Sequence, residues 1–392
     1  MRKLSADLIL TNTGNALDNA VLIVDESGVI QDIISNAKEI EGVEHFSGII
    51  TPGFVNAHCH LELSHLKDVI ATGTGLIPFI KGVVNLRDFP QDVIDEAIRL
   101  ADQEMWDNGI MAVGDISNQK DTIPTKSVSK LRYYTFVEMF DFLQEENAQG
   151  VFEQYREVFE AQVDVGLHKK SYVPHAPYSV SKTLFNYVNE LNPQGVTVSI
   201  HNQELKAENE LFLSKTGGFI DFYKDFSIDL STFASSGKTS IHYILEHLAP
   251  KFKTLMVHNT MTDKQDIMFA HAWNQQTYWV TCPNANLYIE NRLPSYDLFI
   301  DSDAKMCIGT DSLTSNWSLS ILEEMRTIKK YQSFVPDELI VKWATLNGAK
   351  ALGYDDLGYF EKGLSPGIIH IDVPCKGGDF DLSKSKGMTR IY

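Results

Sequence analysis

The fold is decided by residues 51–61, which read Thr-Pro-Gly-Phe-Val-Asn-Ala-His-Cys-His-Leu. The apolar run before the histidines predicts a buried β-strand. Because successive side chains on a strand point to opposite faces, His58 and His60 share one face and Cys59 points the other way. Two imidazoles on one face can bind a single metal ion, although pairs at this spacing also occur often on solvated surfaces. The stretch therefore predicts a strand with a candidate metal site at its carboxyl end.

Apolar runs of this kind recur along the chain, with helical patterns such as residues 93–101 and 319–325 between them. Eight strand–helix units predict an α/β fold, a (β/α)8 TIM-like barrel. A doubly wound open sheet is the alternative, but no G-x-G-x-x-G turn follows the first strand. The eight predicted strands are residues 50–58, 111–115, 133–138, 172–175, 196–201, 254–258, 278–282 and 306–311.

Both ends of the chain have a different pattern. Residues 20–24 and 29–34 are strand candidates on either side of a turn, which predicts a hairpin. Residues 367–373 are another strand candidate, behind a Ser-Pro-Gly turn. We therefore expect two domains, a small β-sandwich formed by residues 1–49 plus 356–392 and the barrel over residues 50–355.

Polar side chains close several of the predicted barrel strands. In a (β/α)8 barrel the carboxyl ends of all strands meet at one mouth, so these side chains converge. His201, His258 and Asp311 close the fifth, sixth and eighth strands, where they would join His58 and His60. Taken singly, His201 could be a core histidine and Asp311 a helix N-cap. Taken together, the five residues predict one polar site at the barrel mouth.

These motifs resemble those of the amidohydrolase superfamily, in its deaminase and chlorohydrolase branch. The stretch at 51–61 resembles the first-strand signature, and the later motifs follow in the family's order. The segment at 175–179 is similar to one in S-adenosylhomocysteine and methylthioadenosine deaminases, and residues 204–223 resemble aminofutalosine deaminases. The resemblance implies the same barrel and terminal β-sandwich. The later motifs are His-Ala-Pro-Tyr-Ser at 175–179, His-Asn-Gln-Glu at 201–204, Val-His-Asn at 257–259, Cys-Pro-Asn-Ala-Asn at 282–286, Gly-Thr-Asp-Ser at 309–312 and the closing segment 346–353.

The resemblance implies a metal site with four ligands. His58, His60, His201 and Asp311 would bind one divalent ion, Zn²⁺ or Fe²⁺, with Zn²⁺ as the first expectation. Binuclear relatives use a carboxylated lysine at the end of the fourth strand, whereas this strand ends in Tyr-Val-Pro-His at 172–175. The resemblance therefore implies a mononuclear centre that lowers the pKa of a water molecule.

The resemblance also implies how the side chains share the chemistry. Asp311 would accept the proton of the attacking water, and Glu204 would protonate a ring nitrogen of the substrate. His258 would orient the water or stabilise the developing oxyanion, and His175 would face the substrate. We therefore expect a metal-dependent hydrolytic deaminase that releases ammonia from an aminated heterocycle, with an adenine nucleoside-like compound as the first candidate.

Other functions stay open from the sequence. A chlorohydrolase or a cyclic-amide hydrolase could use the same mononuclear site, and a non-catalytic binding protein could keep the fold. Three departures from the family pattern leave the heterocycle open. Ala285 stands where many relatives have serine, residues 75–80 lack a glutamate for ribose hydroxyls, and no arginine pair is recognisable for an amino-acid carboxylate.

Composition limits the partners. The 392 residues carry 52 acidic and 34 basic side chains, a formal net charge of −18, which disfavours nucleic acid and anionic membrane surfaces. No apolar stretch is long enough to span a bilayer, and Asp7 interrupts the apolar run that a secretory signal needs. The four cysteines form no C-x-x-C pair, which is typical of reduced thiols. We expect a cytoplasmic enzyme with a small heterocyclic partner, and a homodimer as the commonest assembly.

Overall fold

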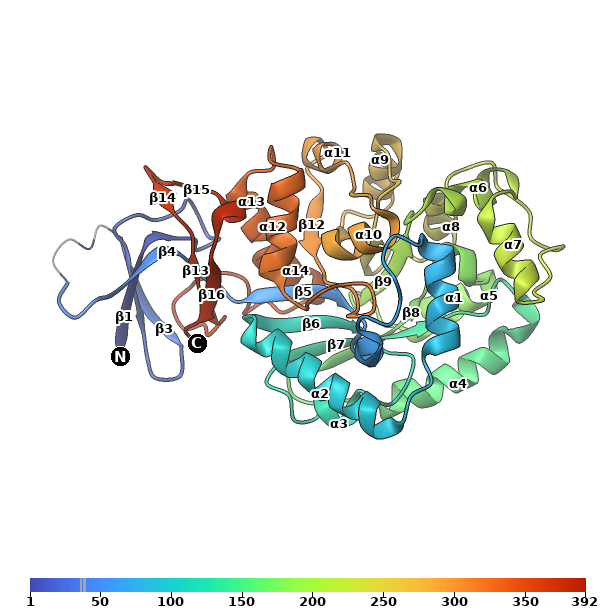
Figure 1. Cartoon of the computed structure of the whole chain (residues 1–392), viewed down its shortest axis with the longest axis horizontal. Coiled ribbons are helices and arrows are strands. Elements are labelled where there is room, and N and C mark those ends of the chain that lie inside the picture. Colours follow the sequence, from blue (N-terminus) through green and yellow to red (C-terminus); the bar gives the residue numbers. More distant parts are fainter. Residues whose placement is uncertain (36, 38–39) are drawn as a thin grey trace.

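The computed structural model describes residues 1–35, 37 and 40–392, which form a large α/β body and a small sheet beside it (Figure 1). Both chain ends lie in or beside the small sheet, where the dark blue and dark red segments meet (Figure 1). Among the described residues, no helix is both long enough and apolar enough to cross a membrane. The small sheet contains strands from both ends of the chain, as the sequence predicted.

Eight parallel strands form the barrel, in the order in which they occur in the chain. They pair as two four-stranded sheets, β5-β6-β7-β8 and β9-β10-β11-β12. Side chains fill the inside and helices cover the outside, so most strand residues are buried. The strand bounds are β5 Phe54–Cys59, β6 Ile110–Ile116, β7 Arg132–Met139, β8 Lys169–Pro174, β9 Thr197–Asn202, β10 Lys253–His258, β11 Thr277–Thr281 and β12 Lys305–Ile308.

Two seams close these sheets into one barrel. At the first, the backbone N–H of His201 donates to the carbonyl of His175 at 2.9 Å. At the second, the N–H groups of residues 310 and 311 both donate to the carbonyl of His58 at 3.0 Å. Gly309 permits this approach, because a Cβ there would lie 2.8 Å from the Cβ of His58. The (β/α)8 fold is confirmed, and its last strand lies against its first.

Helices connect the strands and pack around the barrel (Figure 1). The predicted helical segment 93–101 lies within α2, Gln91–Asp107, and the segment 319–325 overlaps α12, Ile321–Tyr331. The other α-helices are α1 Leu76–Leu86, α3 Ile123–Lys126, α4 Ala148–Ala161, α5 Lys182–Leu191, α6 Lys206–Ser214, α7 Gly218–Asp225, α8 Ser240–His247, α9 Lys264–Trp273, α10 Pro283–Glu290, α11 Tyr296–Asp301, α13 Asp337–Lys342 and α14 Gly348–Leu352. Shorter or irregular turns of helix are η1 Leu61–Leu66, η2 Glu145–Asn147, η3 Pro177–Ser179, η4 Trp343–Asn347 and η5 Leu382–Lys384.

The small domain is built on a six-stranded sheet with the order β16-β13-β4-β1-β2-β3. Strands β1 and β4 pair in parallel and the other neighbours are antiparallel. Its apolar side chains, such as Leu22 and Ile368, form a core separate from that of the barrel. The bounds are β1 Arg2–Ile9, β2 Val21–Val24, β3 Ile30–Ile34, β4 Glu44–Pro52, β13 Ile368–Asp372 and β16 Gly387–Arg390, with a separate ribbon of β14 Cys375–Lys376 and β15 Asp379–Phe380.

The prediction of a single strand over residues 50–58 was wrong, because two strands occupy this stretch. Strand β4 ends at Pro52 in the small sheet, where it pairs with Ile368, and β5 begins at Phe54 in the barrel. Gly53 lies between them, and a Cβ there would meet the Met111 side chain at 2.2 Å. Because both strands are buried and apolar, hydrophobic pattern alone did not show that the chain changes sheets at Gly53.

Candidate active site

The histidines at the strand ends converge at the barrel mouth. The Nε2 atoms of His58 and His60 lie 3.2 Å apart, and one ring nitrogen from each, together with one from His201, lies within 4.8 Å of the others. Asp311 Oδ1 lies 3.7 Å from His58 Nε2 and 3.5 Å from His60 Nε2. The structure therefore brings together all four side chains predicted as metal ligands.

The chemistry of this donor set fits a divalent ion. His201 Nδ1 donates to the carbonyl of His175 at 2.8 Å, so Nε2 is the atom that could bind a metal ion. Against the lowering effect of burial, the carboxylate of Glu138 raises the pKa of His201 to about 9, so a bound ion would displace a proton from Nε2. Burial lowers the pKa of His60 to about 4, so this ring is neutral at pH 7. Asp311 Oδ2 accepts a hydrogen bond from Ser315 at 2.6 Å, while Oδ1 faces the imidazoles. Three imidazoles and one carboxylate oxygen suit Zn²⁺ or Fe²⁺ better than Mg²⁺ or Ca²⁺.

The backbone that holds this site is strained. Gln203, His258 and Asp311 have φ angles of 46°, 74° and 58°, in the left-handed region that costs residues other than glycine on the order of 1–3 kcal/mol each. Hydrogen bonds offset this cost next to Asp311, because Asn56 donates to Thr310 Oγ1 at 2.7 Å and accepts from the Thr310 N–H at 3.0 Å. Strain of this kind concentrates at functional sites.

Glu204 is a carboxyl group beside the cluster. Its backbone N–H and that of Gln203 both donate to Glu208, at 3.1 and 2.9 Å, so the buried Glu208 fixes the loop that carries Glu204. Burial raises the pKa of Glu204 to about 8, against the lowering effect of His201 and with the support of Asp311. At neutral pH Glu204 therefore holds a proton that it can donate to a bound molecule.

His258 lies between Glu204 and Asn286. Its Nε2 is 3.8 Å from Glu204 Oε1, and its Nδ1 is 2.8 Å from Asn286 Oδ1. Because an amide oxygen only accepts hydrogen bonds, Nδ1 carries the proton and Nε2 presents a lone pair. Burial lowers the pKa of His258 to about 3, so the ring stays neutral and can accept a hydrogen bond at Nε2.

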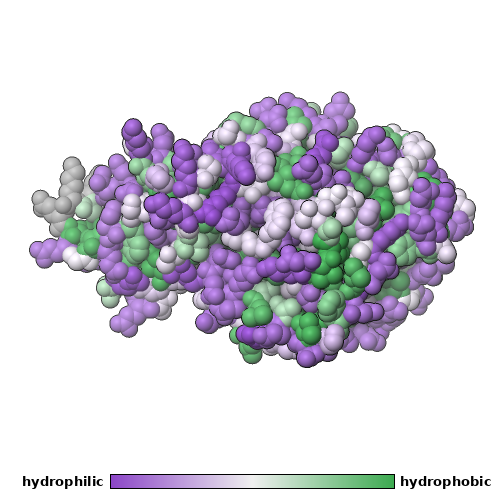
Figure 2. Space-filling model, in the orientation of Figure 1, coloured by the Kyte–Doolittle hydropathy of each residue, from purple (hydrophilic) through white to green (hydrophobic). Residues whose placement is uncertain are grey.

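A pocket with mainly apolar walls opens onto this cluster. Helix α1 runs along it beside the strand ends (Figure 1), and apolar side chains also gather on the molecular surface near α1 (Figure 2). Walls of this kind bury a planar ring, while the polar cluster binds its substituents. The apolar lining comes from Leu63, Leu76, Phe79, Ile80, Val83, Val84, Phe140, Phe142, Tyr178, Phe222 and Ile289.

His175, predicted to face the substrate, lies in the same pocket. Its Nδ1 is 2.6 Å from Ser179 Oγ, and its ring meets that of Tyr178 edge-on with the centroids 5.7 Å apart. Burial lowers the pKa of His175 to about 4. The ring is therefore neutral and held in place, with Nε2 as its remaining polar atom.

Sequence reasoning missed four polar residues that line the pocket. Glu138 lies at the end of the third barrel strand, so the rule that selected the strand-end histidines could have found it. Glu62 accepts hydrogen bonds from the backbone N–H of Asn118 and of the next residue, at 2.8 and 3.0 Å. Arg87 and Asn118 lie on connecting segments, whose position no periodicity predicts. The four are Glu62, Arg87, Asn118 and Glu138.

Comparison with known proteins identifies the family. The model of the Amidohydrolase family matches residues 49–390, nearly the whole chain. The chain belongs to the amidohydrolase family. It is therefore a hydrolytic enzyme that acts on C–N bonds, and the resemblance seen in its motifs is confirmed.

Two curated relatives match along most of the chain. An aminodeoxyfutalosine deaminase of Nitratiruptor sp. is 26% identical over 384 residues, which cover 95% of this chain and 90% of the relative. An adenosine deaminase of Helicobacter pylori is 26% identical over 353 residues, which cover 89% of this chain and 84% of the relative. Both are deaminases by name, at an identity that does not fix a substrate.

Solved structures share the fold over the full chain. The aminofutalosine deaminase of Helicobacter pylori, in complex with methylthio-coformycin, superposes with a TM-score of 0.78 at 21% identity and covers 100% of both chains. An atrazine chlorohydrolase from Arthrobacter aurescens, complexed with zinc and atraton, has a TM-score of 0.75 at 16% identity and covers 98% of this chain and 91% of its own. At these identities the likeness shows the fold alone.

Proposed function

We propose that this protein is a metal-dependent deaminase of an adenine nucleoside-like compound and that it releases ammonia. The observation that carries the proposal is the arrangement of Glu204, a buried carboxyl with a pKa of about 8, beside a cluster of three imidazoles and one carboxylate at the same pocket. This pairing supplies a general acid next to a metal site. The names of the two curated relatives support an adenine nucleoside as the substrate.

His58, His60, His201 and Asp311 are the proposed ligands of one divalent ion, with Zn²⁺ preferred and Fe²⁺ as the alternative. When bound, such an ion would activate a water molecule for attack on a carbon atom at neutral pH. The chain's own residues then have to place the ring, orient the water and move protons.

Glu204 acts as the general acid in this proposal. Its proton passes to a ring nitrogen, which makes the neighbouring amidine carbon more electrophilic while water attacks it. The carboxylate so formed can take a proton from the added hydroxyl group and deliver it to the exocyclic amine, which leaves as ammonia. The loop fixed by Glu208 keeps the carboxyl group at the ring edge through both transfers.

Asp311 and His258 act on the water in this proposal. Asp311 Oδ1 accepts one proton of the water, since Oδ2 already accepts from Ser315. After ammonia leaves, this proton returns to Glu204, which restores both groups. His258 presents an Nε2 lone pair, because its Nδ1 proton is donated to Asn286. A lone pair can orient the water but cannot donate to an oxyanion, so the site favours the first of the two roles that the sequence left open for His258.

The test is a substrate panel with zinc-loaded protein. Adenosine, methylthioadenosine, S-adenosylhomocysteine, aminodeoxyfutalosine, adenine, cytosine and atrazine are each incubated with the protein, and the release of ammonia and chloride is measured. We expect ammonia from at least one adenine nucleoside, with kcat/KM above about 10⁴ M⁻¹s⁻¹. Chloride from atrazine without ammonia would instead identify a chlorohydrolase. Tight binding of a nucleoside with no product would identify a non-catalytic binding protein.

A further inference from the structure

Glu138 is a buried carboxylate on the wall of the pocket that the mechanism does not use. It lies at the end of β7, is 2% exposed and lines the pocket together with Glu204 and His175. Single polar atoms of Glu138, His175 and His201 lie within 4.8 Å of one another. Glu138 therefore lies in the same pocket as the proposed catalytic groups, beside His175, the residue predicted to face the substrate.

The carboxylate of Glu138 has fewer hydrogen bonds than a buried charge requires. Its Oε1 lies 3.3 Å from His201 Nδ1, but the one proton on that nitrogen is donated to the carbonyl of His175 at 2.8 Å. Within the described part of the chain, Oε1 receives no hydrogen bond. Oε2 accepts only a long one, from Asn118 Nδ2 at 3.3 Å. Burial opposes the charge, but the imidazoles of His175 and His201 lower the pKa of Glu138 and keep it ionised. The carboxylate therefore offers acceptor positions that a donor on a ligand can use.

A second acceptor without a donor lies next to Glu138. Asn118 Oδ1 is buried and, among residues 1–35, 37 and 40–392, nothing donates to it. The backbone N–H of Asn118 is held by Glu62 at 2.8 Å, so the side chain starts from a fixed position. Two neighbouring acceptors on one wall are complementary to two neighbouring donors on a ligand.

We propose that Glu138 and Asn118 bind a vicinal diol of the substrate, the two adjacent hydroxyl groups of its sugar. Each hydroxyl donates to one acceptor, and the hydrogen bond to the carboxylate is charge-assisted. This inference rests on the proposed function, which supplies the sugar. It also accounts for the absence of a glutamate in residues 75–80, because the carboxylate for the diol comes from the third strand instead.

Glu138 could alternatively orient His201 only, since carboxylates often hold metal-binding histidines. That role predicts a different pattern of effects. A residue that orients a metal ligand affects metal content and the turnover of every substrate equally, whereas a residue that binds one hydroxyl affects only substrates that carry that hydroxyl.

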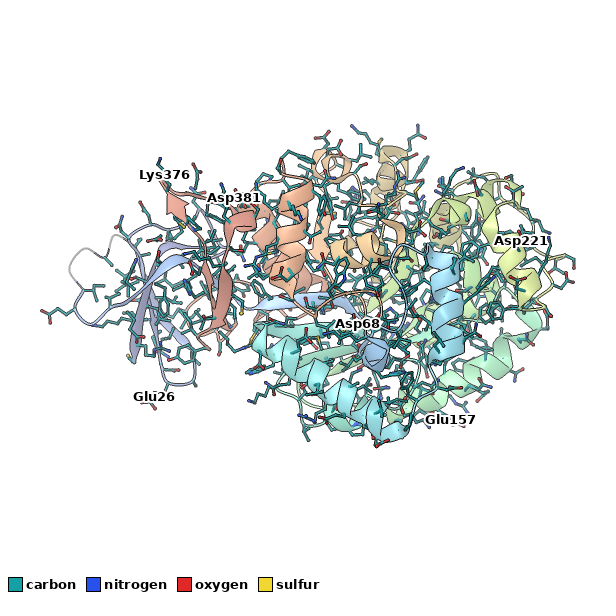
Figure 3. All side chains as sticks on the ribbon, viewed as in Figure 1. Glu26, Asp68, Glu157, Asp221, Lys376 and Asp381 are labelled. Atoms are coloured by element: carbon teal, nitrogen blue, oxygen red, sulfur yellow. The ribbon has the colours of Figure 1, made fainter. Side chains whose placement is uncertain are left out.

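The experiment compares adenosine with 2′-deoxyadenosine and 3′-deoxyadenosine. Turnover is measured for the zinc-loaded wild type, Glu138→Gln and Asn118→Ala, with Glu157→Gln as the matched control. Glu157 lies on α4 with its side chain at the molecular surface (Figure 3). Equilibrium binding of the three nucleosides is measured by calorimetry in the Glu204→Gln background, with and without Glu138→Gln, so that one readout does not depend on turnover. Zinc content is determined for each variant.

We expect the wild type and Glu157→Gln to prefer adenosine over either deoxynucleoside by about 10- to 100-fold, the size of one lost hydrogen bond to a charged group. Glu138→Gln and Asn118→Ala should each reduce at least threefold the preference over one deoxynucleoside, the one that lacks the hydroxyl bound by the substituted residue. Turnover of that deoxynucleoside and the zinc content should stay within threefold of wild type. A preference unchanged in both variants would overturn the inference.

Two other outcomes would also overturn it. A loss of zinc with an equal fall in turnover of all three nucleosides would show that Glu138 orients His201. Two zinc ions per chain would show that Glu138 belongs to a second metal site. If the wild type turns over adenosine without discriminating against the deoxynucleosides, only the inference fails. If no adenine nucleoside is bound or deaminated, the proposed function fails with it.

Discussion

The cluster around Lys126 and the cluster at the barrel mouth both contain buried charged side chains, and their hydrogen bonding differs. In the first, Lys126 Nζ contacts Asp115 at 2.6 Å and both Ser117 and Thr135 at 3.0 Å, so its three protons all have acceptors. The other oxygen of Asp115 accepts from the Leu61 N–H at 2.8 Å. Both members of this pair are fully buried, and each is satisfied within the protein.

The second cluster, at the barrel mouth, lacks this balance. His58 and His60 bring two Nε2 atoms to 3.2 Å, while His58 Nδ1 and Glu138 Oε1 have no hydrogen-bond partner within the described residues. His258 and Asp311 add strained backbone. A buried network in which every polar group is hydrogen-bonded stabilises a fold. A network with unpaired polar groups needs a ligand or a metal ion to pair with them. The comparison therefore separates a structural cluster from a binding site by hydrogen bonding alone.

Metal removal should have the largest effect, and it should act on the mouth cluster alone. Dialysis against a chelator should abolish activity, and adding back Zn²⁺ should restore it with about one ion per chain by elemental analysis. Because the ion binds only the folded state, it should also raise the unfolding free energy, by about 4 kcal/mol at 1,000 times its Kd. Full activity after chelation, or two ions per chain, would contradict the assignment of His58, His60, His201 and Asp311.

Glu204→Gln should leave the metal bound but reduce kcat by about 10²- to 10⁴-fold, because the amide cannot donate and recover a proton in turn. The measurement is ammonia release alongside zinc content, with Glu157→Gln as the control. Turnover within threefold of wild type would remove Glu204 from the mechanism.

Lys126→Met should affect the other cluster and lower stability. It leaves Asp115 buried without its cation, which costs about 3–5 kcal/mol of unfolding free energy. Denaturant unfolding measures this loss, and Lys120→Met, at a half-exposed lysine, should stay within about 0.5 kcal/mol of wild type. Equal stability of both variants would show that hydrogen bonding does not distinguish the clusters as we infer.

The pH dependence of turnover is the smallest expected effect. Burial raises the pKa of Glu204 to about 8, so the general acid is protonated below that value and ionised above it. We expect kcat/KM to fall as pH rises past about 8, approaching roughly tenfold per pH unit. A profile that stays flat to pH 10 would contradict the role of Glu204 as an acid.

Much of this site could be predicted, because in a barrel the position of a residue along its strand determines where its side chain lies. His58 and His60 lie at the end of β5, His201 at the end of β9 and Asp311 just beyond β12, and the fold then requires them to meet. Glu138 met the same criterion and was overlooked because no family motif includes it. Asn118 lies on a loop, and strand periodicity gives no position for loop residues.

Other features depend on atomic contact that sequence patterns do not carry. The sequence did not show that the chain changes sheets at Gly53, because the buried strands on either side of it are equally apolar. The sequence did not predict the left-handed φ of His258, because that conformation is rare for residues other than glycine. Both follow from close packing between segments far apart in the chain.

The seam between β5 and β12 has a consequence for biosynthesis. Asn56 and Thr310, hydrogen-bonded across it, are 254 positions apart. The histidine pair begins two residues after Asn56, and Asp311 directly follows Thr310. A nascent chain released from the ribosome before residue 311 would carry three of the four proposed ligands and lack the carboxylate. Long-range closure of this kind is slow compared with local folding. High-affinity metal uptake should therefore begin only when the barrel has closed, and a chain that stalls earlier would compete poorly for zinc in the cell.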